Sequence, residues 1–165
     1  MAKIDTNQKL IPTTTTCTTI NTNTSKAKTS TIKYDFEVSP YRGELTEKNY
    51  YGSFSFNCSE LTRKGVEFIK IDNFDFRFLG IDYGKTDLLF AEAVFRDGDF
   101  LGLTASGADF SFICGFFNLS EASFAYNVNS SFGAANVTFS LRQVTNDNFA
   151  TVFAPEPSIL MKVVV

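Results

Sequence analysis

The sequence predicts an all-β protein, an antiparallel β-sandwich or barrel of about eight or nine short strands. Three observations indicate this class. Apolar and polar residues alternate with a period of two from residue 34 onward, as they do in half-buried strands. Turn residues such as Asp97-Gly98, a strong hairpin signal, separate the alternating runs. No segment carries the sustained apolar stripe of an amphipathic helix.

The expected strands follow one another along the chain. In the first, Tyr34, Phe36 and Val38 alternate with charged residues. Further alternating runs cover residues 52–56, 73–78, 110–116, 124–128 and 137–142. Residues 66–71 and 88–95 are apolar at successive positions, which predicts central strands buried on both faces. Residues 119–122 predict one short turn of helix.

Phenylalanine dominates the expected interior. The chain has 19 Phe and 6 Tyr but no Trp. Each Phe-rich strand face must pack against another, because exposed stripes of this length would aggregate. We expect a dry aromatic core. The alternative is a Phe-lined barrel cavity that carries a small apolar ligand, as lipocalins do.

The sequence also excludes several catalytic chemistries. The chain contains no His, so a Ser-His-Asp triad, a Cys-His dyad and His-based proton transfer are ruled out. No Gly-x-Ser-x-Gly motif is present. We therefore expect no enzyme activity, no catalytic residue and no cofactor.

Closely spaced carboxylates suggest a weak alternative, a calcium site at Asp82, Asp87, Asp97 and Asp99. The spacing is not that of an EF-hand. Asp97 and Asp99 also flank a Gly in the expected hairpin, where Asp serves the backbone of the turn. We favour the turn interpretation over the metal site.

A second candidate is a sugar-binding platform of Tyr41, Arg42, Tyr50 and Tyr51, whose rings and guanidinium would stack on and hydrogen-bond a carbohydrate. The alternative is an amphipathic strand edge and its loop.

Residues 1–32 differ in composition from the rest and form a Thr-rich arm. Five Lys and one Asp give residues 1–33 a net charge of +4, and the 10 basic and 17 acidic residues that follow give −7. The acidic body makes nucleic-acid binding unlikely on electrostatic grounds. Because Thr favours extended backbone, the arm predicts strand addition to the sheet edge of a neighbouring copy, and the alternative is a solvated tail. The assembly residues would be Thr13, Thr15, Cys17, Thr19 and Ile20.

Three cysteines, Cys17, Cys58 and Cys114, form no Cys-x-x-Cys pair, so metal ligation is poorly supported. We expect Cys58 and Cys114 to be buried thiols. The alternative is a Cys58–Cys114 bridge, which would leave Cys17 for pairing between chains.

Short motifs also carry a family resemblance. They are Tyr51-Gly52-Ser53-Phe54-Ser55-Phe56, Gly80-Ile81-Asp82-Tyr83 and the tail Ala154-Pro155-Glu156-Pro157-Ser158-Ile159-Leu160. In the order of these motifs, the chain resembles the secreted β-rich proteins, common in cyanobacteria, that end in a PEP-CTERM sorting signal. The resemblance implies export and a cell-surface or matrix role, with no catalytic site. The sequence departs from it in having no apolar signal-peptide core and no membrane span after the tail.

These observations divide the chain into an arm (1–32), an all-β domain (33–145) and a C-terminal tail or final strand (146–165). We expect a non-catalytic structural or adhesive protein, extracellular or on the cell surface. It would self-assemble into homo-oligomers or filaments through the arm and contact extracellular polysaccharide. The alternative functions are a lipocalin-like carrier and a carbohydrate-binding module.

Overall fold

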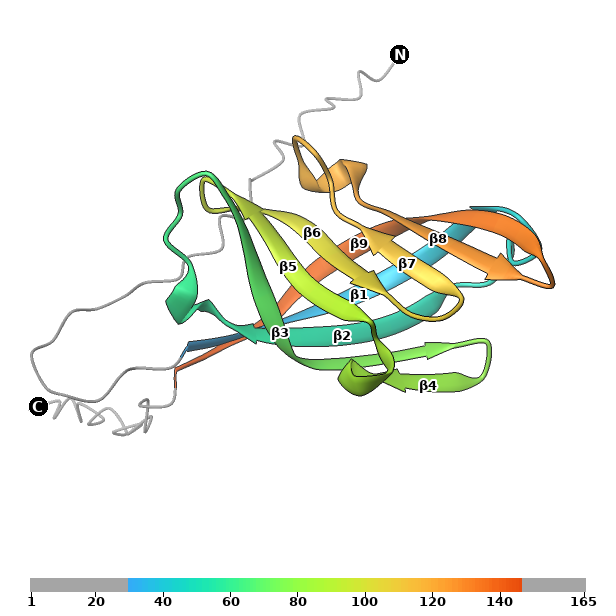
Figure 1. Ribbon diagram of the computed structural model, residues 1–165, viewed down its shortest axis with the longest axis horizontal. Helices are drawn as coiled ribbons and strands as arrows, with labels where there is room; N and C mark the ends of the chain where they lie inside the picture. Colours follow the sequence, from blue (N-terminus) through green and yellow to red (C-terminus); the bar gives the residue numbers. More distant parts are fainter. Residues whose placement is uncertain (1–29, 147–165) are drawn as a thin grey trace, which may run out of the picture.

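The computed structural model describes residues 30–146, and this part of the chain folds into nine antiparallel strands and three short 3-10 segments (Figure 1). The strands are β1 Ser30–Arg42, β2 Tyr50–Asn57, β3 Val66–Phe78, β4 Ile81–Gly84, β5 Phe90–Arg96, β6 Asp99–Ser106, β7 Phe110–Ile113, β8 Ser123–Val128 and β9 Ser131–Asn146. The 3-10 segments are η1 Cys58–Glu60, η2 Lys85–Asp87 and η3 Leu119–Glu121. The predicted all-β antiparallel class is confirmed. Among the described residues, no helix has the length and apolarity needed to cross a bilayer.

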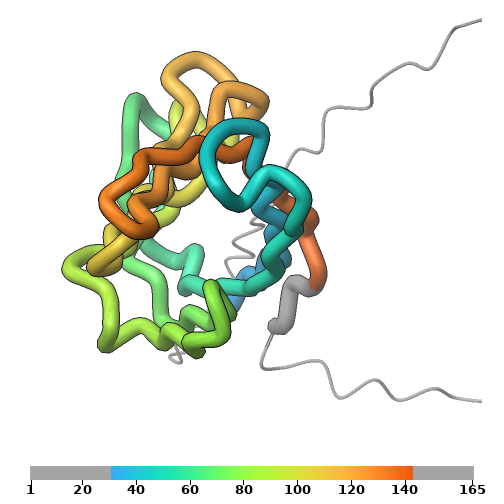
Figure 2. The backbone as a smooth tube through the Cα atoms, turned by 90° about the vertical axis from the view of Figure 1, so that its right-hand side faces the viewer, coloured from blue at the N-terminus to red at the C-terminus, as the bar shows by residue number. Residues whose placement is uncertain are grey.

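Eight of these strands close into an up-and-down barrel. Each pairs with its neighbour in the chain, β9 pairs back onto β1, and β4 is a short extra strand beside β3. Figure 2 looks along the molecule and shows the ring that the strands make. The choice that the sequence left open between sandwich and barrel is therefore decided in favour of a barrel. Of the described strands, β4 pairs on one side only.

Three hairpins share one turn geometry. Two-residue turns join Phe78 to Ile81, Arg96 to Asp99, and Val128 to Ser131. In all three turns, Leu79-Gly80, Asp97-Gly98 and Asn129-Ser130, both residues have positive φ. This is the type I′ turn, whose twist matches that of the flanking strands. The hairpin predicted at Asp97-Gly98 is confirmed.

Aromatic rings fill the barrel interior, as expected. The inward rows of β1 and β2 supply Tyr34, Phe36, Phe54 and Phe56, all nearly inaccessible to solvent. Their rings stack on and against those of the opposite strands; the Tyr34 and Phe100 ring centroids, for example, are 4.5 Å apart. Burial of each such side chain contributes about 1.5–3 kcal/mol. These rings therefore dominate the stability of the fold.

Gly52 occupies an inward position of β2 between these rings. A Cβ added there would lie 2.4 Å from Cζ of Phe36. Glycine at this position makes room for the Phe36 ring, so the gap in the apolar row of β2 is itself part of the packing.

The structure corrects three strand predictions. Residues 66–71 and 73–78 form one strand, β3, with Asp72 as the extra residue of a β-bulge opposite Ser55 and Phe56. The two-faced burial predicted for residues 66–71 and 88–95 is wrong, because Phe68 and Phe90 are about half exposed on the barrel exterior. A closed barrel has one buried face per strand, so apolar residues of the other row reach the surface.

The third correction concerns β7, which ends at Ile113 rather than at residue 116. Beyond it the Gly115 N–H donates to the Leu101 carbonyl, and Phe116 and Phe117 are exposed in the loop that leads to η3. The short helical turn predicted over residues 119–122 is present as η3.

The cysteine predictions are wrong in part. Cys58 is disulfide-bonded, which excludes the Cys58–Cys114 bridge and the thiol expected at Cys58. Cys114 is a free thiol as expected, but it is only partly buried. The partner of Cys58 lies outside the described residues. So do the assembly residues Thr13, Thr15, Cys17, Thr19 and Ile20 and the tail after Asn146. Residues 30–32, predicted as arm, belong to β1.

Candidate functional site

A polar groove on the outside of the barrel, over β2, is the best candidate for a binding site. Because Gly52, Phe54 and Phe56 occupy the inward row of β2, the outward row is Tyr51, Ser53 and Ser55. The two serines are shorter than the side chains on the flanking strands. Two adjoining hollows of about 630 and 490 Å³ follow this row and share the lining residues Lys33, Ser53 and Asp75. We call the combined hollow the β2 groove.

Charged side chains from the neighbouring strands line the β2 groove in equal numbers. The cations are Lys33, Arg77 and Arg142, and the anions are Asp35, Asp75 and Asp82. Arg142 Nε lies 2.8 Å from Asp35 Oδ2, and Arg77 Nε lies 3.7 Å from Asp82 Oδ1. These pairs are largely solvent-exposed and contribute little to stability. They leave the groove with no net charge and with both donors and acceptors.

The floor of the groove is fixed by the pairing of β2 with β3. Ser55 lies opposite Asn73, and the Asn73 amide donates to Ser55 Oγ at 3.0 Å. Ser55 is only 5% exposed, although it lies on the outward face of its strand. The serine hydroxyl is therefore held in place by its neighbour.

Tyr51 lies at one end of the groove. Its hydroxyl donates to the Glu37 carboxylate at 3.3 Å, and the same carboxylate oxygen accepts from the Asn49 amide at 2.7 Å. The side chain is 62% exposed. The groove thus ends beside an aromatic ring whose hydroxyl is held by a hydrogen bond while much of the ring stays open to solvent.

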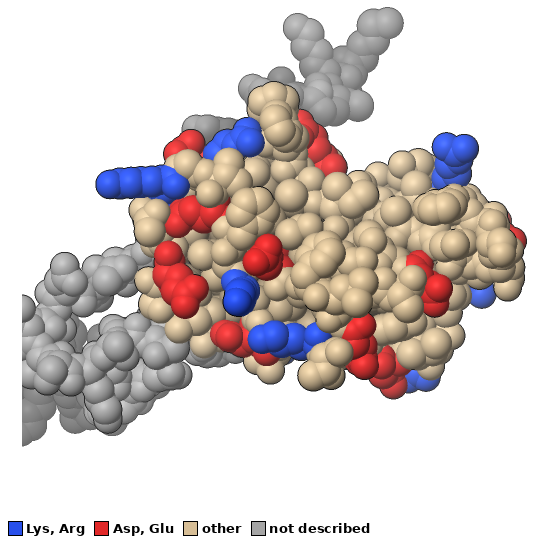
Figure 3. All heavy atoms as spheres, in the orientation of Figure 1, with Lys and Arg blue, Asp and Glu red and all other residues tan. Residues whose placement is uncertain are grey.

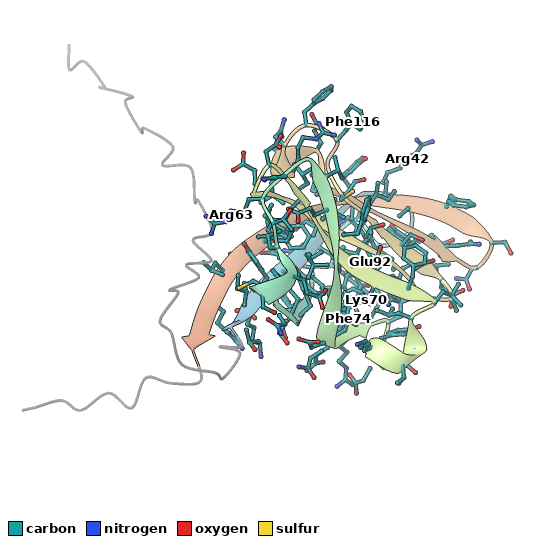
Figure 4. All side chains as sticks on the ribbon, turned by 60° about the vertical axis from the view of Figure 1, so that its left-hand side comes forward. Arg42, Arg63, Lys70, Phe74, Glu92 and Phe116 are labelled. Atoms are coloured by element: carbon teal, nitrogen blue, oxygen red, sulfur yellow. The ribbon has the colours of Figure 1, made fainter. Side chains whose placement is uncertain are left out.

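The four residues predicted as a sugar platform do not meet on one face. Tyr51 lines the β2 groove, but Tyr50 points inward, where its ring packs 4.9 Å from that of Phe78. Burial raises the pKa of Tyr50, and the charge of Tyr126 adds to this shift. Tyr41 and Arg42 are exposed at the end of β1, and Figure 4 shows Arg42 projecting away from the barrel.

The four aspartates predicted as a weak metal site serve separate turns and pairs. Asp87 accepts the Gly84 N–H at 2.7 Å, and Asp97 accepts the Gly65 N–H at 2.8 Å. Asp82 pairs with Arg77, and Asp99 lies opposite Arg96 in the hairpin. Within residues 30–146 no three His, Cys, Asp or Glu side chains are grouped so that they could hold a metal ion.

Inside the barrel that residues 30–146 form, aromatic rings lie close together. Phe76 alone contacts the rings of Phe110, Phe112 and Phe124, with centroid distances of 5.4 to 5.8 Å. A ligand inside the barrel would have to displace these rings. The hollows of the β2 groove lie on the other side of the sheet, in contact with solvent.

Sequence reasoning missed the β2 groove except for Tyr51 and for Asp82, which it assigned to a metal site. The available signal was the row of small polar residues, Ser53 and Ser55, which alternates with a fully apolar row. Comparison of the chain with protein-family models, with curated proteins and with solved structures finds no match.

Proposed function

We propose that the protein is a non-catalytic, exported adhesive protein whose β2 groove binds an extended polysaccharide. The observation that carries this proposal is the composition of the groove: its lining mixes apolar groups with hydrogen-bond donors and acceptors, its charged side chains balance, and it ends on the exposed ring of Tyr51.

The chemistry of the groove suits a carbohydrate. Sugar hydroxyls need both donors and acceptors, which Lys33, Asn73 and Asp75 supply along the floor and walls. The apolar face of a sugar ring stacks on an aromatic side chain, the role that we assign to Tyr51. Residues 51–55 of β2 span about 13 Å at the usual rise per strand residue, which favours an extended ligand.

Export is supported by the cysteines. Disulfides form and persist in oxidising compartments such as the cell exterior and the bacterial periplasm. The disulfide at Cys58 is therefore in keeping with an extracellular or surface location. The resemblance of the body and tail motifs to PEP-CTERM-type secreted proteins points the same way.

Binding to insoluble and soluble polysaccharides tests the proposal. The full chain is incubated with a panel of neutral and charged polysaccharides, and the affinity for any polysaccharide that binds is measured by calorimetry. Ser53→Phe fills the floor of the groove, and Tyr51→Ala removes the ring. We expect each variant to lose at least about tenfold in affinity, equivalent to about 1.4 kcal/mol.

A matched control separates the groove from general surface effects. Asn127→Phe places the same ring on the exposed outer face of β8, outside the groove, and should bind like the wild type. Absence of binding to every polysaccharide in the panel, or full binding by Ser53→Phe, would refute the proposal.

The second candidate function, self-assembly through the Thr-rich arm, is favoured by one observation. Among the described strands, β4 has a partner on one side only, so its other edge is where an added strand could pair with N–H and C=O groups. Full-length protein with Thr15→Pro and Thr19→Pro cannot add a regular strand there. This double variant should form fewer large assemblies than the wild type in sedimentation velocity; equal distributions would exclude the arm.

A further inference from the structure

The exterior of β3 and β5 carries an unusual number of exposed apolar side chains. Val66 and Phe68 of β3, Phe90 of β5 and the preceding Leu89 are all substantially exposed. Lys70 and Glu92 complete the set, which we call the β3–β5 face. In Figure 3 the surface toward the viewer, over β3, β5, β6 and β7, is mostly uncharged, with scattered charged groups.

The strand register orders this face. Phe68 lies opposite Val94, and Lys70 lies opposite Glu92, where the pairing of β3 with β5 ends. Figure 4 shows Lys70 and Glu92 labelled close together on these two strands. Along the barrel, Phe68 is therefore one outward position to one side of the Lys70–Glu92 pair, and Phe90 is one outward position to the other side.

A hollow of about 310 Å³ lies next to Phe90. It is lined by Lys70 and Glu92 on one side and by Lys85, Leu88 and Leu89 on the other. It forms where the chain runs from β4 through η2 into β5, beyond the last residue pair of β3 with β5.

The loop before η3 extends the apolar surface at the Val66 end. Glu121 Oε2 accepts the N–H groups of Phe116 and Phe117, both at 2.8 Å, so the carboxylate fixes the loop. The two side chains are 66% and 70% exposed, and the Arg96 guanidinium lies 5.0 Å from the Phe116 ring. Figure 4 shows Phe116 projecting away from the barrel. The fold therefore keeps both phenyl rings exposed to solvent.

The exposed apolar area approaches what a stable dimer needs. The four phenyl rings of Phe68, Phe90, Phe116 and Phe117 leave about 500 Å² in solvent, taking about 200 Å² for a whole Phe side chain. A standard interface buries about 800 Å² per partner, of which somewhat more than half is apolar. The exposed phenyl area therefore matches the apolar part of a standard interface, and the charged side chains on the face would supply its polar part.

We propose that a second copy of this chain covers the β3–β5 face, related to the first by a two-fold axis that lies in the interface and runs parallel to the strands, between Lys70 and Glu92. Such an axis exchanges the two positions, so each Lys70 faces Glu92 of the other copy and the charges pair. The same rotation places each Phe68 over Val94 of the other copy, so the Phe68 rings of the two copies lie side by side across the axis. The face is thus complementary to itself. This dimer is independent of polysaccharide binding in the β2 groove.

Sedimentation velocity and light scattering of the full chain over a range of concentrations test the proposal. We expect the wild type to dimerise and Phe68→Glu to weaken the dimer at least about 100-fold. Phe132→Glu, a change at a still more exposed Phe in the β8–β9 hairpin, serves as the matched control and should dimerise like the wild type.

Charge reversal beside the proposed axis gives an independent test, at the exposed Lys70 and the partly exposed Glu92. Lys70→Glu and Glu92→Lys should each weaken the dimer about tenfold, and the double variant should restore it. Circular dichroism confirms that each variant is folded. If Phe68→Glu fails to fold, Lys70→Glu decides. A wild type that stays monomeric overturns the proposal, whether its own terminal segments or another partner cover the face. Unchanged dimerisation of Phe68→Glu or of Lys70→Glu also overturns it.

Discussion

The Tyr126 hydroxyl donates to the carbonyl of Arg42 at 2.8 Å, across 84 residues of sequence. The same oxygen accepts the Leu45 N–H at 3.3 Å. Gly43 lies beside it with φ of +104°, and a Cβ there would come within 2.7 Å of the hydroxyl. The loop between β1 and β2 is therefore fastened to β8 by one phenol group at the end of the barrel.

Replacing Tyr126 by Phe should destabilise the fold by about 1–3 kcal/mol, because the Arg42 carbonyl and the Leu45 N–H lose their partner where water has little access. The free energy of unfolding in urea measures the change. Tyr51→Phe removes a hydroxyl whose hydrogen bond to Glu37 is exposed, and should cost less than about 0.5 kcal/mol. Equal losses in the two variants would show that the Tyr126 bond has no special role.

Substituting Ser130 by Gly should stabilise the protein by about 0.5–1 kcal/mol. Ser130 has φ of +63° in the type I′ turn between β8 and β9, a conformation that glycine adopts without steric cost. Thermal unfolding monitored by circular dichroism detects the increase. Ser131→Gly, one residue later at the start of β9, should instead destabilise the strand. A Ser130→Gly protein no more stable than the wild type would contradict the turn assignment.

Acid should loosen the loop that carries Phe116 and Phe117. Hydrogen bonds from the N–H groups of Phe117 and Phe116 lower the pKa of Glu121, and burial opposes this effect. A carboxyl group whose pKa is lower in the folded state than in the unfolded state stabilises the fold above the unfolded pKa, about 4.3. That contribution is lost as the pH falls through the folded pKa.

The difference in melting temperature between the wild type and Glu121→Gln measures this contribution. We expect the wild type to be the more stable at pH 7 and the difference to shrink below about pH 4. A difference that stays constant between pH 7 and pH 3 would show that the charge of Glu121 does not matter.

Alkylation before reduction should distinguish the two cysteines that the structure describes. Between them, Cys114 is the free thiol, and burial raises its pKa, so it should react slowly at neutral pH. Cys58 should react only after reduction. Mass spectrometry of the unreduced digest identifies the peptide joined to Cys58. Labelling of Cys58 without reduction would argue against the disulfide and against the export that it supports.

Local alternation predicted much of this fold, because the period of two assigns inward and outward rows without knowledge of strand order. The inward rows of β1 and of the second half of β3 follow the predicted positions. Alternation could not decide whether an apolar outward residue is covered by another layer or left in solvent. For this reason Phe68 and Phe90 were predicted to be buried, and the β3–β5 face was not expected.

The β2 groove escaped prediction for a different reason. Its walls come from strands far apart in sequence, and only the register brings Asp75 beside Ser53 and Asn73 beside Ser55. A one-residue shift of β3 would place inward Phe side chains in these positions. Spacing along the chain carries no information on such pairings, so the candidate site needed the structure.

The pairing of β1 with β9 brings Ser30 opposite Asn146. The described chain therefore enters and leaves the barrel at the same end. Fusion partners or tethers attached beside Ser30 or Asn146 would hold the molecule by that end. The opposite end of the barrel, which carries Tyr126 and Arg42, would then point outward. A circularly permuted chain, joined near residues 30 and 146 and opened at Asp97-Gly98, should rebuild the same ladder of strands.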